Sequence, residues 1–322
     1  MSKKILLGFT AALATLTGLT IDTIERSPVA LAHHAPGHHV QPRIAQNIQT
    51  LRIAFPGRAG ATDMQTKANA VSQFLSRELG MPVEALVADD TAAVEALRAN
   101  RVDIAFLSSR PALKAQQLAN ARLYLAEVRP NYSGGHTYRS VMVVRNNSPL
   151  RPQANAQQTL RQLRGKRIAF TSPTSGSGFI FPVGEFVRQG LVPNRDRLNG
   201  FFGQVSYGGD YSKALQAVLR GQADVAAVSE YALKPPYLTA AEASQLRVLY
   251  AVSGVPAHGV AIDDDVPAAM RTRITNALLK LNQPANNQLL RNLYNSNRLV
   301  VVNHDRHLNP MRNALKRAGF EP

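Results

Sequence analysis

The chain has 322 residues, of which 45% are hydrophobic and 18% are charged, so it is long enough for two packed domains. It contains no cysteine, which excludes disulfides and thiolate metal sites. Lys and Arg number 37 against 21 Asp and Glu, giving a net charge of +16. This surplus favours anionic partners, but it does not distinguish nucleic acid, a membrane surface and small anions.

The first 32 residues have the order of an export signal. A basic segment at residues 2–4 precedes an apolar stretch at residues 5–14, and Ala30-Leu31-Ala32 fits the small-x-small pattern that signal peptidase cleaves. An uncleaved membrane anchor is the alternative, but Asp22 ends the stretch before the ~20 apolar residues that a span needs. Residues 1–32 are therefore predicted to be a signal peptide.

Residues 33–48 are predicted to be a disordered linker. The segment HHAPGHHV, residues 33–40, holds four histidines that could bind a metal loosely or could form a leader without packed geometry. The Pro, Gly and polar residues around it are typical of a linker.

From residue 49 onward, short apolar runs alternate with helical patterns. Strands are predicted at residues 51–55, 83–87, 102–107 and 137–144, and helices at 64–79, 91–99 and after Pro111. Gly80 stands where a glycine often ends a helix. This alternation predicts a parallel-rich α/β sheet.

A second α/β set follows a loop rich in Pro, Asn and Gln. Strands are predicted at residues 167–170, 204–207, 224–228, 246–252 and 260–262, and helices from near Phe179 and at 211–219, 268–281, 286–294 and 308–318. In both sets a helix ends and an aspartate, Asp103 or Asp224, leads into a buried strand. Two similar lobes are therefore predicted, the first from residues 49–139 and 255–322 and the second from residues 140–254.

The stretch TSPTSGSGFIFPVGEF, residues 171–186, joins a predicted strand to a predicted helix. A helix N-terminus presents N–H groups without intrahelical partners, which suits an anion. Ser175 and Ser177 could add hydroxyl donors, and Gly176 and Gly178 would let the backbone approach a ligand closely. Pro182 is tolerated only in the first helical turn. The alternative is an ordinary serine cap.

Similar strand-to-helix junctions recur in both predicted lobes. They are Ser108-Ser109 before Pro111, Asp89-Asp90-Thr91, and Gly208-Gly209-Asp210-Tyr211. Each junction alone could be a helix cap. Because ligands of such sheets bind at the carboxyl ends of strands, the junctions together favour a ligand cleft between the lobes.

The sequence shows no catalytic constellation. G-x-S-x-G and a spaced carboxylate pair are absent, and the histidines at 136, 258, 304 and 307 are scattered. Residues 304–307 are expected to form a solvated loop before the last helix. Basic residues form no aromatic-rich face, so nucleic-acid binding is not expected. No cofactor, metal site or enzymatic activity is predicted.

These motifs resemble those of the phosphate/phosphite/phosphonate solute-binding proteins of ABC transporters. The resemblance rests on P-x-S-x-S-G-x-x-x-P at residues 173–182, on Leu160–Lys166 and on Asn100–Ala105, and it covers roughly Leu51 to Asp265. It implies the type II periplasmic-binding fold, with two α/β lobes joined by hinge strands near 137–144 and 252–256. It also implies a periplasmic monomer that closes on a small oxyanion and meets the membrane only through its permease.

The resemblance also assigns roles to single residues. Ser175, Gly176 and Ser177 would contact phosphoryl oxygens, with Gly178 beside them. Gly176 replaces a family threonine, Tyr211 replaces a histidine, and Leu107 (beside Ser108 and Ser109) and Thr91 stand where tyrosines occur. Acidic residues that recognise an amine fall near Ser229, Tyr231 and His258, none of them a carboxylate. The adjacent Glu230 is predicted to point away, because side chains alternate along a strand.

Phosphate, phosphite or a small alkylphosphonate is therefore favoured over an aminophosphonate. A stand-alone periplasmic sensor and a binder of a non-phosphorus organic anion remain open. An enzyme on the same fold would need a nucleophile or general base in the cleft.

Overall fold

The computed structural model describes residues 48–57 and 63–320, which lie in a compact unit spanning Arg43–Pro322. The predicted signal peptide and all of the predicted linker except Ile48 lie outside the described residues. Within the described part of the chain, no helix is long and apolar enough to cross a bilayer.

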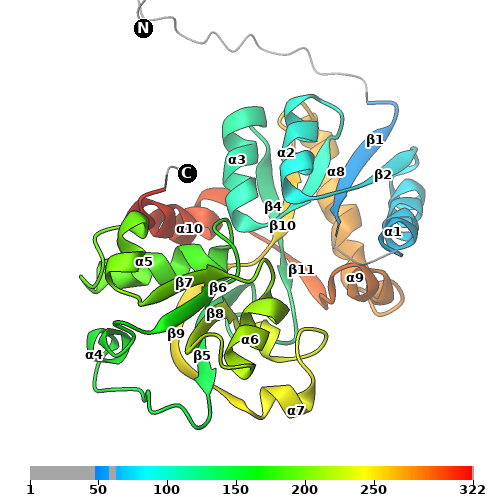
Figure 1. The fold of residues 1–322 in the computed structure, drawn as a ribbon. Helices are drawn as coiled ribbons and strands as arrows, with labels where there is room; N and C mark the ends of the chain where they lie inside the picture. The colour runs from blue at the N-terminus through cyan, green and yellow to red at the C-terminus, as the bar shows by residue number, and fades with distance from the viewer. Residues whose placement is uncertain (1–47, 58–62, 321–322) are drawn as a thin grey trace, which may run out of the picture. The chain divides into compact units, whose positions relative to one another are not determined.

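The first sheet has six strands in the order β11-β4-β10-β3-β1-β2 (Figure 1). They are β1 (Leu51–Pro56), β2 (Val83–Ala88), β3 (Ile104–Leu107), β4 (Arg122–Val128), β10 (Gly259–Ile262) and β11 (Arg298–Val301). The helices of this region are α1 (Met64–Leu79), α2 (Asp90–Arg98), α3 (Ser109–Ala119), α8 (Ala268–Leu279) and α9 (Asn287–Tyr294), with a short 3₁₀ turn at Lys280–Asn282. The β1 strand pairs in parallel with β2 and β3, whereas the pairs of β10 with β3 and β4, and of β4 with β11, are antiparallel.

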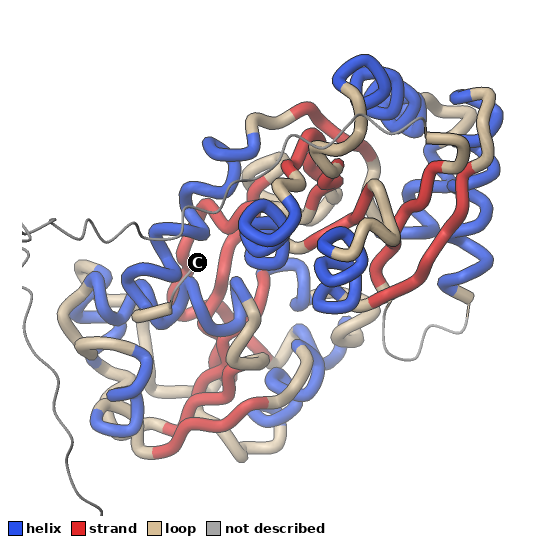
Figure 2. Tube along the Cα trace, turned by 90° about the horizontal axis from the view of Figure 1, so that it is seen from above, coloured by secondary structure: helices blue, strands red, loops and turns tan. Residues whose placement is uncertain are grey.

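The second sheet has five strands in the order β7-β6-β8-β5-β9, and Figure 2 shows helices against the strands of both sheets. The strands are β5 (Thr137–Arg145), β6 (Arg167–Phe170), β7 (Gln204–Tyr207), β8 (Val225–Ser229) and β9 (Leu246–Pro256). The helices are α4 (Ala156–Arg161), α5 (Phe181–Arg188), α6 (Tyr211–Leu219) and α7 (Ala240–Ala243), with a π-helical turn at Gly176–Ile180 and 3₁₀ turns at Arg195–Gly200 and Glu230–Leu233. The β6 strand is parallel to β7 and β8, and β5 is antiparallel to β8 and β9.

The repeated aspartate has the same backbone role in both sheets. In the first, the Arg52 amide donates to Asp103 Oδ2 (2.7 Å) and the Asp103 amide donates to the Arg52 carbonyl (2.9 Å). In the second, the Arg167 amide donates to Asp224 Oδ2 (2.8 Å) and the Asp224 amide donates to the Arg167 carbonyl (2.9 Å). The shared sequence pattern thus fixes where two neighbouring parallel strands begin.

The helix α10 (His304–Ala318) links parts of the chain that are distant in sequence. It packs against α5, and a Cβ on Gly184 of α5 would lie only 3.2 Å from the Ala314 carbonyl of α10. One buried apolar cluster includes residues of both sheets together with Met311 and Leu315 of α10. Two further clusters lie beneath α1, α8 and α9, and beneath α6. The two sheets and α10 therefore share a core.

Several features of the predicted secondary structure were wrong or missing. Each sheet is mixed rather than parallel-rich, because the strands next to the crossings between sheets run antiparallel. The strands β4 and β11 were not predicted, and the Pro-rich loop contains the short helix α4, capped by Asn155.

The expected solvated loop at residues 304–307 is also wrong. The α10 helix begins at His304, with Asn303 Oδ1 accepting from the Arg306 amide (3.0 Å). His304 is 3% exposed and His307 is 5% exposed. The Leu123 amide donates to His304 Nδ1 (2.8 Å), and burial lowers the His304 pKa to about 4, so this imidazole is neutral. Pro310 inside the helix concealed its start, because proline is typical of a first turn.

Candidate functional site

The Ser/Gly loop connects β6 to a π-helical turn, which continues directly into α5. Ser175 caps this turn, because its Oγ accepts from the Gly178 amide (3.0 Å). A Cβ on Gly178 would lie 2.1 Å from Thr171 Oγ1 and 2.8 Å from Ser175 Oγ. Only glycine fits there, since real Cβ atoms do not approach other atoms so closely.

Pro182 is the second residue of α5, as its sequence position required. It has no amide proton, so neither the Gly178 nor the Ser177 carbonyl can accept a helical hydrogen bond from it. The Thr171 amide donates to the Gly178 carbonyl (3.2 Å), and Ser140 Oγ donates to the Ser177 carbonyl (2.6 Å). The proline thus frees two carbonyls, and these fix the loop to β5 and to the end of β6.

Three of the predicted site residues form a connected group of hydroxyls. Ser177 is fully buried, and its Oγ lies 2.9 Å from the Tyr211 hydroxyl at the start of α6. The Tyr231 hydroxyl, which follows β8, lies 3.4 Å from that of Tyr211. Tyr138 of β5 was missed by sequence reasoning; it hydrogen-bonds Ser177, and its ring packs 5.3 Å from that of Tyr231. The segments that follow the carboxyl ends of β6, β7 and β8 therefore bring the hydroxyls of Ser177, Tyr211 and Tyr231 together.

Ser229 lies beside this group. It is the last residue of β8 and pairs with Ser140 of β5, whose hydroxyl holds the Ser177 carbonyl. The Ser229 hydroxyl is buried and has no hydrogen-bond partner among the described residues. Buried hydroxyls are normally satisfied, so this oxygen is suited to a ligand or an ordered water.

Of the first-lobe candidates, Ser109 approaches the loop. Its Oγ lies 4.0 Å from the position of a Cβ on Gly176. Ser108 instead donates both its amide (3.2 Å) and its hydroxyl (2.6 Å) to Asp90. Leu107 is buried in the apolar core, and Thr91 is exposed on α2 beside Asp90. A carboxylate at this junction opposes an anion, because like charges repel more strongly away from bulk water.

A buried ion pair completes the region. Arg129, which follows β4, is 6% exposed, and its Nε lies 3.0 Å from Glu127 Oε1. Its guanidinium lies over the ring of Tyr231 at 5.1 Å and over that of Tyr132 at 5.7 Å. His258 Nδ1 is 3.7 Å from the same Glu127 oxygen. Two predicted site residues therefore contact the same ion pair: the Tyr231 ring packs against Arg129, and His258 lies near Glu127.

The charges in this cluster are fixed by their neighbours. Burial alone would raise the pKa of Glu127, but Arg129, His258 and hydrogen bonds from Ser296 and Tyr132 hold it below its usual value. Glu127 remains a carboxylate, which keeps Arg129 charged. Sequence reasoning missed both residues, because β4 was not predicted and the segment Glu127-Val128-Arg129 carries no motif of its own.

The Glu230 carboxylate forms its hydrogen bonds outside this group of hydroxyls. It accepts from the Ser133 amide and hydroxyl (both 2.9 Å) and pairs with Arg139 Nε (2.6 Å). Burial opposes ionisation, but these bonds lower the pKa of Glu230 below its usual value. Its carboxylate is thus committed to the segment that joins the two sheets.

A cavity of about 360 Å³ adjoins this cluster. It is lined by Arg129, Asn131, Tyr231, the Pro235-Pro236 pair, Tyr237 and Asn295. A guanidinium, amides and aromatic faces together suit a small anion with an apolar part.

Comparisons with known proteins identify the family of this chain. The family described as "ABC transporter, phosphonate, periplasmic substrate-binding protein" matches residues 53–307. The phosphate-import protein PhnD of Mycolicibacterium smegmatis is 25% identical over 179 residues, 55% of this chain and 54% of that protein. The phosphonates-binding periplasmic protein of Escherichia coli is 32% identical over 111 residues, 34% of this chain and 31% of that protein. The matches thus span about half or less of the curated relatives' length.

Among solved structures, PhnD1 from Prochlorococcus marinus in complex with methylphosphonate has a TM-score of 0.65 at 19% identity. The match covers 84% of this chain and 98% of that one. This likeness confirms the predicted type II periplasmic-binding fold. Because the family match spans well over half of the sequence, the chain belongs to the periplasmic substrate-binding proteins of ABC phosphonate transporters.

Proposed function

We propose that the protein captures phosphate, phosphite or a small alkylphosphonate in the periplasm and delivers it to an ABC permease. The observation that carries this proposal is the hydrogen-bonded group of hydroxyls from Ser177 and Tyr231, which are buried, and from the half-buried Tyr211, at three strand ends. Arg129 supplies a positive charge next to it. Membership of a transport family supports the same role and no enzymatic activity.

The loop would bind an oxyanion through donors of two kinds. The first N–H groups of the helical turn, at Gly176 and Ser177, have no intrahelical partner and lie at its positive end. The hydroxyls of Ser177, Tyr211 and Ser229 add donors from the side. Burial raises the pKa of Tyr231 well above its usual value, so its hydroxyl stays protonated.

The same contacts argue against a ligand with an amine. Glu127 is paired with Arg129, and Glu230 is paired with Arg139. A ligand ammonium would need a carboxylate that is not already committed to a guanidinium. A small alkyl group would instead fit the aromatic cavity beside Tyr231.

Capture would proceed by closure about two short connections. Residues 129–136 join β4 to β5, and residues 257–258 join β9 to β10. The flanking strands pair from Thr137 with Pro256 onward, so the two connections lie together. Rotation there would open and close the gap between the start of α3, at Ser109, and the Ser/Gly loop, which lie close together in this structure. We expect the protein to act as a monomer that contacts the membrane through its permease.

Isothermal titration calorimetry with phosphate, phosphite, methylphosphonate, 2-aminoethylphosphonate, sulfate and acetate tests this function. We expect a phosphorus oxyanion without an amine to bind tightest. Ser177→Ala should weaken binding by about 1.5–3 kcal/mol, roughly 10- to 150-fold, because a donor to a charged group is lost.

The exposed Ser244 at the end of α7 provides the matched control, and Ser244→Ala should leave affinity unchanged. If sulfate or acetate binds best, the ligand is not a phosphorus compound. If no anion in the panel binds the folded protein, the proposed function is wrong.

A further inference from the structure

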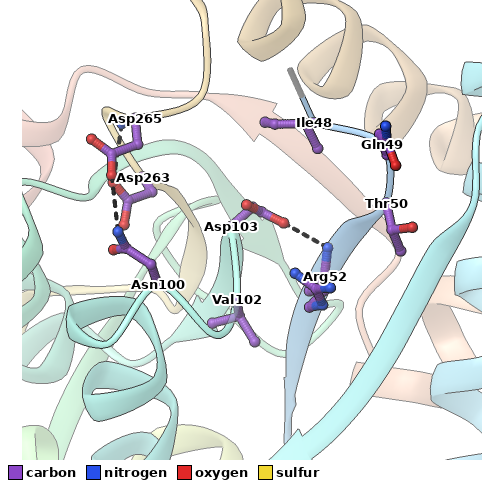
Figure 3. A pocket seen from close by; sticks show the side chains of 9 residues that line it. All are labelled: Ile48, Gln49, Thr50, Arg52, Asn100, Val102, Asp103, Asp263 and Asp265. Carbon is purple, nitrogen blue, oxygen red and sulfur yellow. Dashed lines mark hydrogen bonds between the residues drawn. The ribbon is translucent and has the colours of Figure 1, made fainter. Parts of the chain in front are cut away.

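A second polar cavity, of about 280 Å³, lies at the beginning of the first-sheet strands and is shown in Figure 3. Asp103, Asp263 and Asp265 line it together with Asn100, Arg52 and residues 48–50. The chain carries a net charge of +16, yet carboxylates gather here. The ligand-binding proposal makes no use of this cavity.

The carboxylates belong to one tight turn. Asp263, Asp264 and Asp265 follow β10, and each offers an oxygen within 4.8 Å of the others. The Asp265 amide donates to Asp263 Oδ1 (3.1 Å), and the Asp263 amide donates to the Asp103 carbonyl (2.9 Å). Asn100 Nδ2 lies 3.3 Å from Asp265 Oδ2, so an amide from the end of α2 joins the group. The turn is thereby held against the start of β3.

Asp263 distinguishes this group from an ordinary acidic surface. The residue is 3% exposed, and its Oδ2 is buried without a hydrogen-bond partner among the described residues. It lies beside Asp265 on the wall of the cavity, as Figure 3 shows. An ionised oxygen buried in this way is strongly unfavourable unless a proton or a cation neutralises it.

The guanidinium groups of the neighbouring Arg52 and Arg271 contact groups other than the Asp263 carboxylate. Arg52 Nε lies 3.5 Å from Glu84 Oε2 on β2. Arg271 Nη1 donates to the carbonyls of Asp264 (3.0 Å) and Val266 (2.6 Å). A cation at this cluster would favour the ionised form of its carboxylates, because opposite charges attract.

We propose that Asp263, Asp264 and Asp265 bind a divalent cation, with calcium preferred. The donors are hard oxygens without histidine or sulfur, which disfavours zinc. Three consecutive aspartates give an irregular set of ligands, which suits the flexible coordination of calcium better than the strict octahedron of magnesium. The cavity bounded by Asp103 leaves room for the water molecules that complete the shell.

The bound cation would stabilise the structure of the first lobe. The turn connects β10 to α8, and its backbone is bonded to Asp103 at the start of β3. Neutralising the carboxylates would therefore hold β10, β3 and α8 together. The first lobe would be stabilised without any change in the anion site.

Thermal denaturation and calorimetry of chelator-treated, full-length folded protein with CaCl₂ test this inference, with NaCl at matched ionic strength as reference. We expect binding with a Kd in the range of about 10⁻⁴–10⁻³ M and a rise in Tm that follows saturation. Asp263→Asn and Asp264→Asn should each lose at least about tenfold in calcium affinity, because each removes a charged ligand.

The exposed Asp196 serves as the matched control, and Asp196→Asn should keep the full calcium response. Asp263→Asn should also be at least as stable as the wild type without metal, since the amide removes an unneutralised charge. A wild-type protein that binds no calcium at about 10 mM, or an Asp263→Asn protein that responds like the wild type, would overturn the proposal. Tighter binding of magnesium would overturn the choice of calcium.

Discussion

Asp103 in the first sheet and Asp224 in the second make the same backbone bonds, but the charges around them differ. Arg167 Nη2 lies 2.8 Å from Asp224 Oδ1, and its side-chain hydrogen bond lowers the pKa of Asp224. Arg52, the equivalent arginine, pairs with Glu84 instead, and burial raises the pKa of Asp103. One aspartate is neutralised by its own strand partner, and the other lies among further carboxylates.

The two lobes also differ at the carboxyl ends of their strands, where the strand-to-helix junctions lie. In the first lobe, Ser108 gives its hydroxyl and amide to Asp90. In the second, the Ser177 hydroxyl meets that of Tyr211. A repeated sequence pattern thus reproduces strand starts, while single side chains set the local charge and the free hydrogen-bonding groups at each end of the two sheets.

The largest expected effect concerns the Ser/Gly loop, because Gly178 has no counterpart in the Ser108-Ser109 junction. Gly178→Ala should destabilise the protein by about 3 kcal/mol in urea unfolding, since its Cβ would overlap Thr171. Gly176→Ala is the control. Its Cβ would come closest to the methyl end of the flexible Met311 side chain, at 2.9 Å, and would lie 4.0 Å from Ser109 Oγ, so it should cost less. Equal losses for the two variants would contradict this account of the loop.

The aspartate comparison predicts unequal losses from equal substitutions. Asp224→Ala removes a hydrogen-bond acceptor for the Arg167 amide and an ion pair, and should cost about 2 kcal/mol at neutral pH. Asp103→Ala removes the same kind of acceptor but relieves repulsion, so it should cost less than half as much. Because the Asp224 pKa is lowered, its contribution is present above about pH 4 and is lost as the pH falls further. Urea unfolding across this range checks both statements.

The pH dependence at Asp263 should have the opposite sign. Its pKa is raised to about 6, so the folded wild type loses relative stability as the pH rises from about 4 through 6. The charged groups around it are Asp103, Asp264, Asp265, Arg52 and Arg271. In chelator, Asp263→Asn should be more stable than the wild type by about 1–3 kcal/mol near pH 7 and equal to it near pH 4. Parallel stability curves for the two proteins would disprove this.

The smallest effect is expected at Asp90. Asp90→Asn keeps an acceptor for Ser108 but removes a negative charge from the first-lobe junction. If that junction faces the bound anion, affinity should rise by about 2- to 3-fold, an effect of roughly 0.5 kcal/mol. Asp89→Asn, at the neighbouring helix cap, keeps the cap and provides the comparison. Unchanged anion affinity would place the carboxylate too far from the ligand.

Local patterns predicted much of the secondary structure. The strands at 167–170 and 204–207 and the helices at 64–79 and 211–219 have the predicted bounds. In these segments apolar periodicity and end signals lie within a few residues of each other. The strands β4 and β11 were missed because they pair with each other across a long stretch of sequence, and β11 has only four residues.

The residues of the candidate site likewise fall into those that the sequence could identify and those that it could not. Ser177 and Tyr211 follow strands that the sequence predicted, so they could be named. Arg129 and Glu127 could not, because a strand of the first sheet places them while Ser296 and Tyr231, far along the chain, enclose them. The burial of His304 likewise depends on Leu123. Such long-range partners leave no periodic trace around the residue itself.

The Met311 methyl that closes over Gly176 has a consequence for how the chain folds. The loop is made long before α10, yet its buried contact comes from residue 311. The second lobe therefore cannot reach its final packing during synthesis until α10 has emerged. A chain cut after residue 303 should retain exposed apolar surface on α5, and it should be a better substrate for proteases and chaperones than for its transporter.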